Sequence, residues 1–234
     1  VERQGLISVP PLNSAPKAVC FDLDGTLLDS LDDLADSMNA ALREFGHPEH
    51  PTNAYRYFTG DGARVLVTRT LPEAHRNPET VETVFQCYQA IYRKSWHNKT
   101  RPYSGIPELL DALQARDLPL TVLSNKPHAS TVVCVEEILK DWGFKVILGQ
   151  RDSVPRKPDP AGVFEIAEKL QLAPGDFLYL GDTAIDMQTA TAAGCVTVGV
   201  LWGFREADEL REHGAQHLIA TPLDLLKLLP PVRV

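Results

Sequence analysis

The sequence predicts an α/β fold in which a doubly wound, mostly parallel, Rossmann-like sheet carries an inserted all-helical cap domain. Three observations lead to this prediction. From Tyr103 onward, short apolar runs alternate with helical patterns, as in sheets whose strands are joined by helices. These runs are continuously apolar, which suits strands buried on both faces. Between Asp29 and Arg101 no strand of useful length occurs, and this stretch is too long for a loop.

The first part of the chain supplies one strand and the predicted cap. Residues 1–16 contain three prolines, and we expect them to form an extended lead-in, with the core beginning near residue 17. A helix is predicted over 31–45, because its apolar residues recur at helical spacing and Gly and Pro follow it. Two further cap helices are expected over about 61–71 and 78–96.

The rest of the chain is expected to complete the sheet and its helices. Strands are predicted over 118–123, 146–148, 177–180, 196–201 and 218–219. Helices are predicted over 106–115, 129–142, 160–170, 184–193 and 207–213. This divides the chain into a catalytic core of residues 17–28 and 102–234 and a helical cap of residues 29–101.

Four polar segments follow strand-like runs. They are Asp22-Leu23-Asp24-Gly25-Thr26, Ser124-Asn125-Lys126, Arg156-Lys157-Pro158, and the stretch from Gly181 to Asp186. In an open parallel sheet the carboxyl ends of the strands share one edge, where ligands bind. The first segment alone would also suit an ordinary Asp-Gly turn. The four together favour a catalytic site.

In content and order these segments resemble the four motifs of the haloacid dehalogenase-like hydrolase superfamily. The resemblance spans roughly the whole chain. Within the superfamily the chain is most similar to the phosphoglycolate phosphatase group, because of its Asp22-Leu23-Asp24-Gly25-Thr26-Leu27 segment, its Ser124-Asn125-Lys126 segment and the stretch from Val198 to Gly203. The family carries a cap between its first and second motifs, where the helical patterns occur here.

The resemblance implies a phosphatase that acts through an aspartyl-phosphate. Asp22 suits the nucleophile, since a carboxylate can split one hard displacement into two easier ones. Asp24 would protonate the leaving oxygen and then take a proton from the hydrolytic water. Hard oxygen ligands suit Mg²⁺, which Asp22, the backbone carbonyl of Asp24 and Asp182 would bind, with Asp186 behind them. Asp182 and Asp186 are also residues that cap a helix N-terminus.

Other residues are candidates for substrate binding. Ser124 and Lys157 would hold the phosphoryl oxygens by hydrogen bond and by charge. Asn125 is expected to touch the substrate or to orient loops, and Lys126 suits a role in the site and a solvated position equally. In the cap, Arg64 follows a glycine turn and is a candidate to pair with a substrate carboxylate. A surface position is the alternative for Arg64.

The composition narrows the possible partners. The formal net charge is −8, which disfavours nucleic acid, whereas a small anion responds to the local field. No apolar stretch approaches the roughly 20 residues that span a bilayer. The four cysteines include no Cys-x-x-Cys pair, which is typical of reduced thiols and disfavours zinc. We expect a cytoplasmic enzyme acting on a small phosphorylated metabolite, without a nucleic-acid or membrane partner. Monomer and homodimer both agree with the sequence.

Several alternative functions differ from this one at single residues. A dehalogenase or phosphonatase lacks the second acid of the first motif, which is Asp24 here, and a sugar-phosphate mutase usually has Val in place of Thr26. A pyrophosphatase or a sugar-phosphate phosphatase stays open, because residues that touch the leaving group are not fixed by these motifs. A phosphorylation-sensing binding module is the non-enzymatic alternative, but it needs neither Asp24 nor a helical insert.

Overall fold

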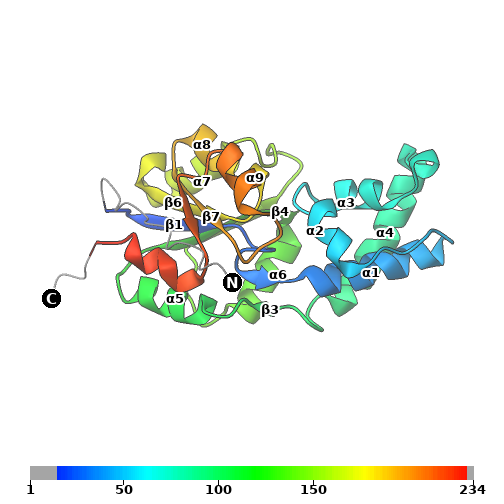
Figure 1. Cartoon of the computed structure of the whole chain (residues 1–234), viewed down its shortest axis with the longest axis horizontal. Coiled ribbons are helices and arrows are strands. Elements are labelled where there is room, and N and C mark those ends of the chain that lie inside the picture. Colours follow the sequence, from blue (N-terminus) through cyan, green and yellow to red (C-terminus); the bar gives the residue numbers. More distant parts are fainter. Residues whose placement is uncertain (1–14, 231–234) are drawn as a thin grey trace, which may run out of the picture.

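Six parallel strands form the central sheet, in the order β5-β4-β1-β6-β7-β8 (Figure 1). The computed structural model describes residues 15–230, so that all but the end of the expected lead-in over residues 1–16 lies outside the described range. The strands are β1 (Ala18–Phe21), β4 (Leu120–Pro127), β5 (Val146–Gln150), β6 (Phe177–Gly181), β7 (Val196–Val200) and β8 (His217–Ile219).

The chain starts the sheet in its middle and extends it in two directions. Val19 of β1 is in register with Leu120 of β4 on one side and with Leu178 of β6 on the other. β5 continues the first side, and β7 and β8 continue the second. This reversal of direction leaves the carboxyl ends of β4, β1 and β6 adjacent, at the crevice where open α/β sheets bind ligands. The predicted doubly wound parallel sheet is confirmed.

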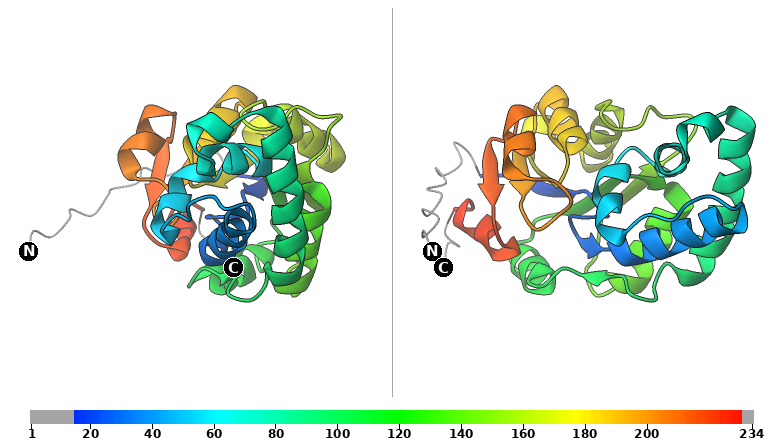
Figure 2. Two further views of the ribbon diagram at one scale, coloured as in Figure 1. Left: turned by 90° about the vertical axis from the view of Figure 1, so that its right-hand side faces the viewer. Right: turned by 45° about the vertical axis from the view of Figure 1, so that its right-hand side comes forward.

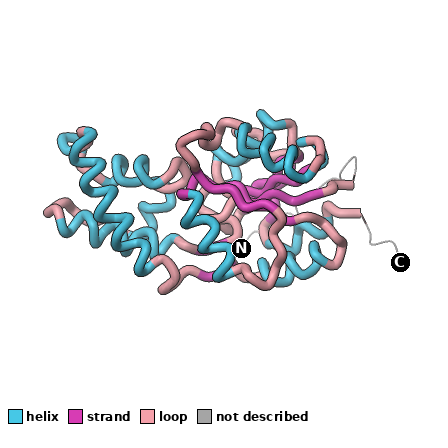
Figure 3. Tube along the Cα trace, turned by 180° about the vertical axis from the view of Figure 1, so that it is seen from behind, coloured by secondary structure: helices cyan, strands magenta, loops and turns pink. Residues whose placement is uncertain are grey.

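Helices cover both faces of the sheet (Figure 3). They are α5 (Ile106–Gln114), α6 (His128–Ile138), α7 (Ala161–Leu170), α8 (Ala184–Ala193) and α9 (Ala207–Glu212). Val19 and Phe21 belong to the apolar cluster that includes α5 and α6, whereas Ala18 and Cys20 belong to the cluster that includes α7 and α8. Because neighbouring strand residues point to opposite faces, an unbroken apolar run fills both clusters.

The chain between β2 (Leu28–Asp29) and β3 (Arg101–Pro102) forms the helical insertion, which lies beyond the carboxyl edge of the sheet (Figures 1 and 2). Its elements are α1 (Leu31–Glu44), the 3₁₀ turn Thr52–Ala54, α2 (Tyr55–Phe58), α3 (Ala63–Thr70), the 3₁₀ turn Glu73–His75 and α4 (Pro78–Ser95). The two short strands β2 and β3 are antiparallel and pair where the chain leaves and returns. Among the helices of residues 15–230, none is long and apolar enough to cross a membrane.

Packing of α1 against α4 supplies the interior of the insertion. Met38 and Ala41 on α1 and Val84 and Tyr88 on α4 are all buried, as expected for apolar residues spaced three and four apart on helices. They belong to the same apolar cluster as Val19 and Phe21 of the sheet. The insertion and one face of the sheet therefore share a continuous core.

A buried carboxylate fixes the point at which the chain returns from the insertion. Asp33 on α1 is 2% exposed. It accepts hydrogen bonds from the backbone N–H groups of Lys99 and Thr100, and from the Thr100 hydroxyl at 2.7 Å. Because each of these bonds goes to a charged acceptor, the set is stronger than neutral bonds would be. Asp33 thus holds the start of α1 against the segment that leads into β3.

The structure differs from the sequence-based elements at several places. The helix predicted over 129–142 ends at Ile138, and the short strands β2 and β3 were not predicted. The single helix predicted over 61–71 is a shorter α3, preceded by α2, because Gly60 and Gly62 adopt positive φ angles of 111° and 90° and interrupt the helix. The strand predicted over 118–123 runs instead through Pro127, with an irregular register after Leu123. A 3₁₀ segment, Pro222–Lys227, was not predicted.

Candidate active site

A cavity of about 280 Å³ lies between the carboxyl edge of the sheet and the insertion. Asp22, Asp24 and Ser124 line it from the core. Leu66 and Tyr88 are among the residues that line it from the insertion. The cavity is therefore enclosed by two parts of the chain of different composition.

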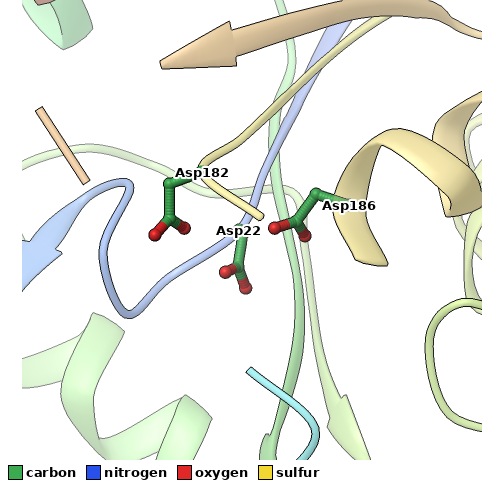
Figure 4. Close-up of side chains that lie close together, drawn as sticks. All are labelled: Asp22, Asp182 and Asp186. Carbon is green, nitrogen blue, oxygen red and sulfur yellow. The ribbon is translucent and has the colours of Figure 1, made fainter. Parts of the chain in front are cut away.

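Three aspartates converge beside this cavity (Figure 4). Asp22 directly follows β1, Asp182 directly follows β6, and Asp186 lies in the first turn of α8. One carboxylate oxygen from each lies within 4.8 Å of the other two, and all three residues are buried. The topology brings them together because β1 and β6 are neighbours whose carboxyl ends coincide.

Lys157 completes this cluster from the loop that follows β5. Its Nζ lies 2.9 Å from Asp22 Oδ1 and 2.7 Å from Asp186 Oδ1, and it also donates to the Leu123 carbonyl at 3.0 Å. The lysine side chain is 3% exposed. Its three donors are thus directed to three acceptors, which is the condition under which a buried ammonium is tolerated.

The cluster carries more negative than positive charge. Three carboxylates face one ammonium, so two negative charges stay uncompensated when all are ionised. Burial, partly offset by Lys157 and reinforced by Asp186, raises the pKa of Asp22 to about 7. Burial, together with repulsion from Asp186 and Asp22, also raises the pKa of Asp182 well above its usual range. Buried carboxylate oxygens with this excess charge fit a hard divalent cation.

Two glycines leave the space that the Asp182 carboxylate occupies. A Cβ added to Gly25, which has φ of +91°, would lie 2.3 Å from Asp182 Oδ2, and one added to Gly203 would lie 2.2 Å from Asp182 Cβ. The carboxylate is then oriented by the Thr26 hydroxyl at 3.1 Å and the Phe204 backbone N–H at 2.8 Å. The Asp22-Leu23-Asp24-Gly25-Thr26 segment therefore also shapes the pocket for an acid from another strand.

Asp186 has a structural role and an electrostatic role. Its Oδ2 accepts from the backbone N–H and hydroxyl of Thr183 at 3.1 and 2.6 Å, which forms a capping box at the start of α8. Its Oδ1 accepts from Lys157. The helix-capping alternative weighed for Asp186 is thus realised, and the same cap turns the carboxylate toward the cluster.

Asp24 lies at the cavity and is held by different partners. It accepts from the Ser30 hydroxyl at 2.7 Å, and Lys126 Nζ lies 3.0 Å from both of its oxygens. Lys126 also donates to the Tyr92 hydroxyl on α4 at 2.7 Å. Its side chain is only 6% exposed, so the solvated position considered for Lys126 is wrong. Tyr92 lies in the cap helix predicted over 78–96, and the sequence gave no sign of this contact.

Ser124 and Asn125 occupy different positions. Ser124 lines the cavity beside Asp22 and Asp24. The Asn125 side-chain amide donates to the carbonyls of Gly60 and Lys157 at 3.0 and 3.1 Å, and its oxygen accepts from the Lys157 backbone N–H. Of the two expectations for Asn125, the geometry favours loop orientation, because both donors and the acceptor are engaged within the protein.

The structure does not bring Arg64 to the other candidate residues. Its side chain is 58% exposed, lies 2.9 Å from Glu82 and packs over the Phe85 ring. It is not among the residues that line the cavity. The helical phase of α3 turns Ala63 and Leu66 toward the cavity instead. Arg93 and Gln89 on α4 line the cavity, and sequence reasoning gave neither of them a role.

The family model of the haloacid dehalogenase-like hydrolases matches residues 19–200 of the chain. The chain belongs to this family. It is 33% identical over 218 residues to the phosphoglycolate phosphatase of Nitrosospira multiformis, covering 91% of this chain and 95% of that one. It is also 33% identical over 226 residues to the phosphoglycolate phosphatase of Haemophilus influenzae, covering 93% and 100% of the two chains. The predicted phosphoglycolate phosphatase-like hydrolase of this family is confirmed.

Solved structures agree with this relationship. A candidate phosphoglycolate phosphatase from Lactobacillus delbrueckii subsp. bulgaricus superimposes with a TM-score of 0.87 at 31% identity, covering 93% of this chain and 100% of that one. A hydrolase of the haloacid dehalogenase-like family from Streptococcus pneumoniae superimposes with a TM-score of 0.82 at 24% identity, covering 91% and 97% of the chains, which shows a common fold.

Two arginines join the insertion of this hydrolase to its core, and neither was predicted. Arg56 on α2 donates to the carbonyls of Gly203 and Phe204 at 2.7 and 3.1 Å. In return, Arg205 donates to the carbonyls of Arg56 and Thr59. Because the Phe204 N–H also orients Asp182, the loop that contacts the insertion is the loop that holds this acid.

Proposed function

We propose that this hydrolase is a Mg²⁺-dependent phosphatase that transfers the phosphoryl group of a small metabolite to Asp22 and then to water. The observation that carries the proposal is the buried cluster of Asp22, Asp182, Asp186 and Lys157, which reaches the cavity through Asp22, with Asp24 also lining the cavity. A phosphate ester needs charge neutralisation, an in-line nucleophile and a proton donor. These residues are of the types that supply all three.

The acidic cluster is the part suited to the metal. Asp22, Asp182 and the backbone carbonyl of Asp24 would hold Mg²⁺, with Asp186 at or behind them. The bound ion would neutralise charge on the phosphoryl oxygens and orient the group for attack. The excess of negative charge in the buried cluster supports this assignment, since Lys157 alone balances one carboxylate of three.

The two carboxylates of the first motif divide the chemistry. In the first step an Asp22 oxygen bonds to phosphorus while the ester bond to the leaving oxygen breaks, and Asp24 gives that oxygen a proton. In the second step Asp24 takes a proton from water, whose oxygen bonds to phosphorus as the acyl-phosphate bond breaks. Ser30 and Lys126 fix the Asp24 carboxylate toward the cavity. Breaking that bond returns Asp22 as a free carboxylate, and inorganic phosphate leaves the site.

Ser124 and Lys157 are proposed to contact the phosphoryl oxygens. A hydroxyl donates one hydrogen bond, and an ammonium next to the nucleophile offsets the charge of the incoming dianion. Lys157 already lies 2.9 Å from Asp22, so it is near the position at which the transferred group would sit. Asn125 holds the Lys157 backbone in place.

The proposed substrate is 2-phosphoglycolate. It is supported by relatives named phosphoglycolate phosphatase that are 33% identical and cover more than nine-tenths of the chain. The test is release of phosphate by the purified protein from a panel of esters, with Mg²⁺ or with a chelator. We expect the highest kcat/KM for 2-phosphoglycolate and no turnover with the chelator. A higher kcat/KM for pyrophosphate or a sugar phosphate would overturn the assignment of 2-phosphoglycolate as the substrate. Turnover that does not need metal, or no turnover at all, would contradict the proposed phosphatase.

A further inference from the structure

The wall that the insertion contributes to the cavity is mostly apolar. Leu34, Ala63, Leu66 and Tyr88 line it, and Phe204 closes it from the core loop. Tyr88 is stacked against Tyr92, with ring centroids 5.6 Å apart, and both are buried. Such a wall desolvates whatever leaving group projects from the phosphate. A charge on that leaving group consequently needs a partner within the protein.

Among the described residues, two cations line the cavity, and one of them is already paired. Lys126 lies 3.0 Å from both Asp24 oxygens. The other is Arg93 on α4, whose Nε donates to the Gln89 carbonyl at 3.2 Å. Within residues 15–230 no carboxylate lies within ion-pair distance of Arg93, in contrast to Arg64, which is paired with Glu82. Arg93 is itself exposed, and its terminal nitrogens are thus available to a ligand at the cavity.

Gln89 adds neutral hydrogen-bonding groups beside this cation. It stands one turn before Arg93 on the same helix and lines the same cavity. Residues four apart lie on one face of a helix, so the amide and the guanidinium project next to each other. Together they offer a planar, bidentate cation and a side-chain amide, which is a combination that recognises a carboxylate.

The cavity also has room for a leaving group. An apolar protein cavity of about 150 Å³ holds a benzene molecule, and the cavity here is about 280 Å³. It therefore accommodates a phosphoryl group together with a small organic unit. The wall around that unit is mostly apolar, and the residues with polar groups that α4 contributes are Tyr88, Gln89, Tyr92 and Arg93.

We propose that Arg93, with Gln89 beside it, binds a carboxylate of the leaving alcohol, so that the substrates are phosphorylated hydroxy acids. This inference rests on the proposed phosphatase function and names the residue that selects its substrate class. It moves the cap's anion-binding role from Arg64, where the sequence placed it, to α4. Both 2-phosphoglycolate and a bulkier ester such as O-phospholactate carry the required carboxylate.

The test compares two leaving groups of equal length in matched variants. The substrates are 2-phosphoglycolate and 2-hydroxyethyl phosphate, in which a hydroxymethyl group replaces the carboxylate. The variant is Arg93→Gln, the control is Arg64→Gln, and Arg93→Lys restores the charge without the bidentate geometry. Loss of a hydrogen-bonded charge pair is expected to lower kcat/KM for 2-phosphoglycolate about 10- to 100-fold. The same variant is expected to keep kcat/KM for 2-hydroxyethyl phosphate within about twofold of the wild-type value.

The remaining outcomes separate the carboxylate-binding role of Arg93 from the phosphatase function on which it rests. They also distinguish between substrates. Arg64→Gln is expected to match wild type on both esters, and Arg93→Lys to recover part of the loss. An equal effect of Arg93→Gln on both esters, or no effect on either, overturns the carboxylate assignment while the phosphatase stands. Absence of Mg²⁺-dependent turnover on every ester overturns the phosphatase itself. A higher kcat/KM for O-phospholactate than for 2-phosphoglycolate identifies the larger hydroxy acid as the preferred member of the class.

Discussion

The two sides of the cavity differ in composition: charged side chains gather on the core side, and the insertion side is mostly apolar. On the core side, Asp22, Asp182, Asp186 and Lys157 are buried and bonded to one another or to backbone. On the insertion side, apolar residues dominate and Arg93 has no carboxylate partner among the described residues. A fixed charged site suits a group common to all substrates, namely phosphate. An apolar wall with one free cation suits discrimination among leaving groups. This difference in composition supports the proposed division, in which the core carries out the chemistry and the cap selects the leaving group.

Removing the proposed nucleophile is expected to be the largest perturbation of the core side. We expect Asp22→Asn to lower kcat by about 10⁴-fold or more on every ester, because an amide does not form the acyl-phosphate. The substitution also removes one charge from an over-charged cluster, so the melting temperature should not fall. Phosphate release and a thermal melt measure the two effects. Activity near that of wild type would contradict the mechanism.

The second largest effect is expected from a substitution that crowds the Asp182 carboxylate. An added Cβ at Gly203 would lie 2.2 Å from Asp182 Cβ and 2.5 Å from the Gly25 carbonyl, so Gly203→Ala should displace the acid. We expect about a 100-fold lower kcat/KM on all esters and a loss of roughly 1–3 kcal/mol of stability. Gly143→Ala is the matched control, since nothing lies within 4 Å of its added Cβ. A substrate-selective loss in Gly203→Ala would break the division between the two sides.

Tyr92 belongs to the insertion but contacts the core through Lys126, so its substitution tests how far the two sides of the cavity act separately. Its hydroxyl accepts from Lys126, which in turn contacts Asp24. We expect Tyr92→Phe to lower kcat about 3- to 10-fold on carboxylated and neutral esters alike, the scale of one lost hydrogen bond. The control is Tyr55→Phe, whose hydroxyl bonds Asn39. If Tyr92→Phe affected KM for the carboxylated ester alone, Tyr92 would belong to the selective wall.

The smallest expected effect concerns the stability of the metal-free protein. The pKa of Asp22 rises from 3.8 to about 7 on folding. Its stabilising contribution is therefore complete below the unfolded pKa and is lost as the pH rises through about 7. Between about pH 5 and pH 8 we expect a fall of at least about 1 kcal/mol, or roughly 2–4 °C in Tm. Mg²⁺ should abolish this fall, and the same pH profile with and without Mg²⁺ would argue against the metal site.

The core side was largely predictable because its signals are local. Asp22 and Asp182 each directly follow a buried strand, and parallel strands bring such positions to one edge. The pattern of apolar runs predicts that edge without knowledge of the strand order. The role of Gly203 could not be foreseen, because the side chain it accommodates comes from another strand.

The insertion side was less predictable because its site depends on helix phase and packing. Two glycines with positive φ delay the start of the helix expected over 61–71, and the resulting α3 turns Leu66 toward the cavity and leaves Arg64 outside it. The burial of Lys126 depends on Tyr92, a residue of a distant helix. Arg93 lies in the cap helix predicted over 78–96, and only the packing of α4 over the sheet edge brings it to the cavity.

The most direct test of the account is to locate the transferred phosphoryl group. The protein is mixed with 2-phosphoglycolate or with 2-hydroxyethyl phosphate, quenched in acid during turnover, digested and analysed by mass spectrometry. The account predicts a phosphoryl group on Asp22 with both esters, and none in Asp22→Asn. Phosphorylation of another residue, or turnover by Asp22→Asn without any phosphoprotein, would contradict it.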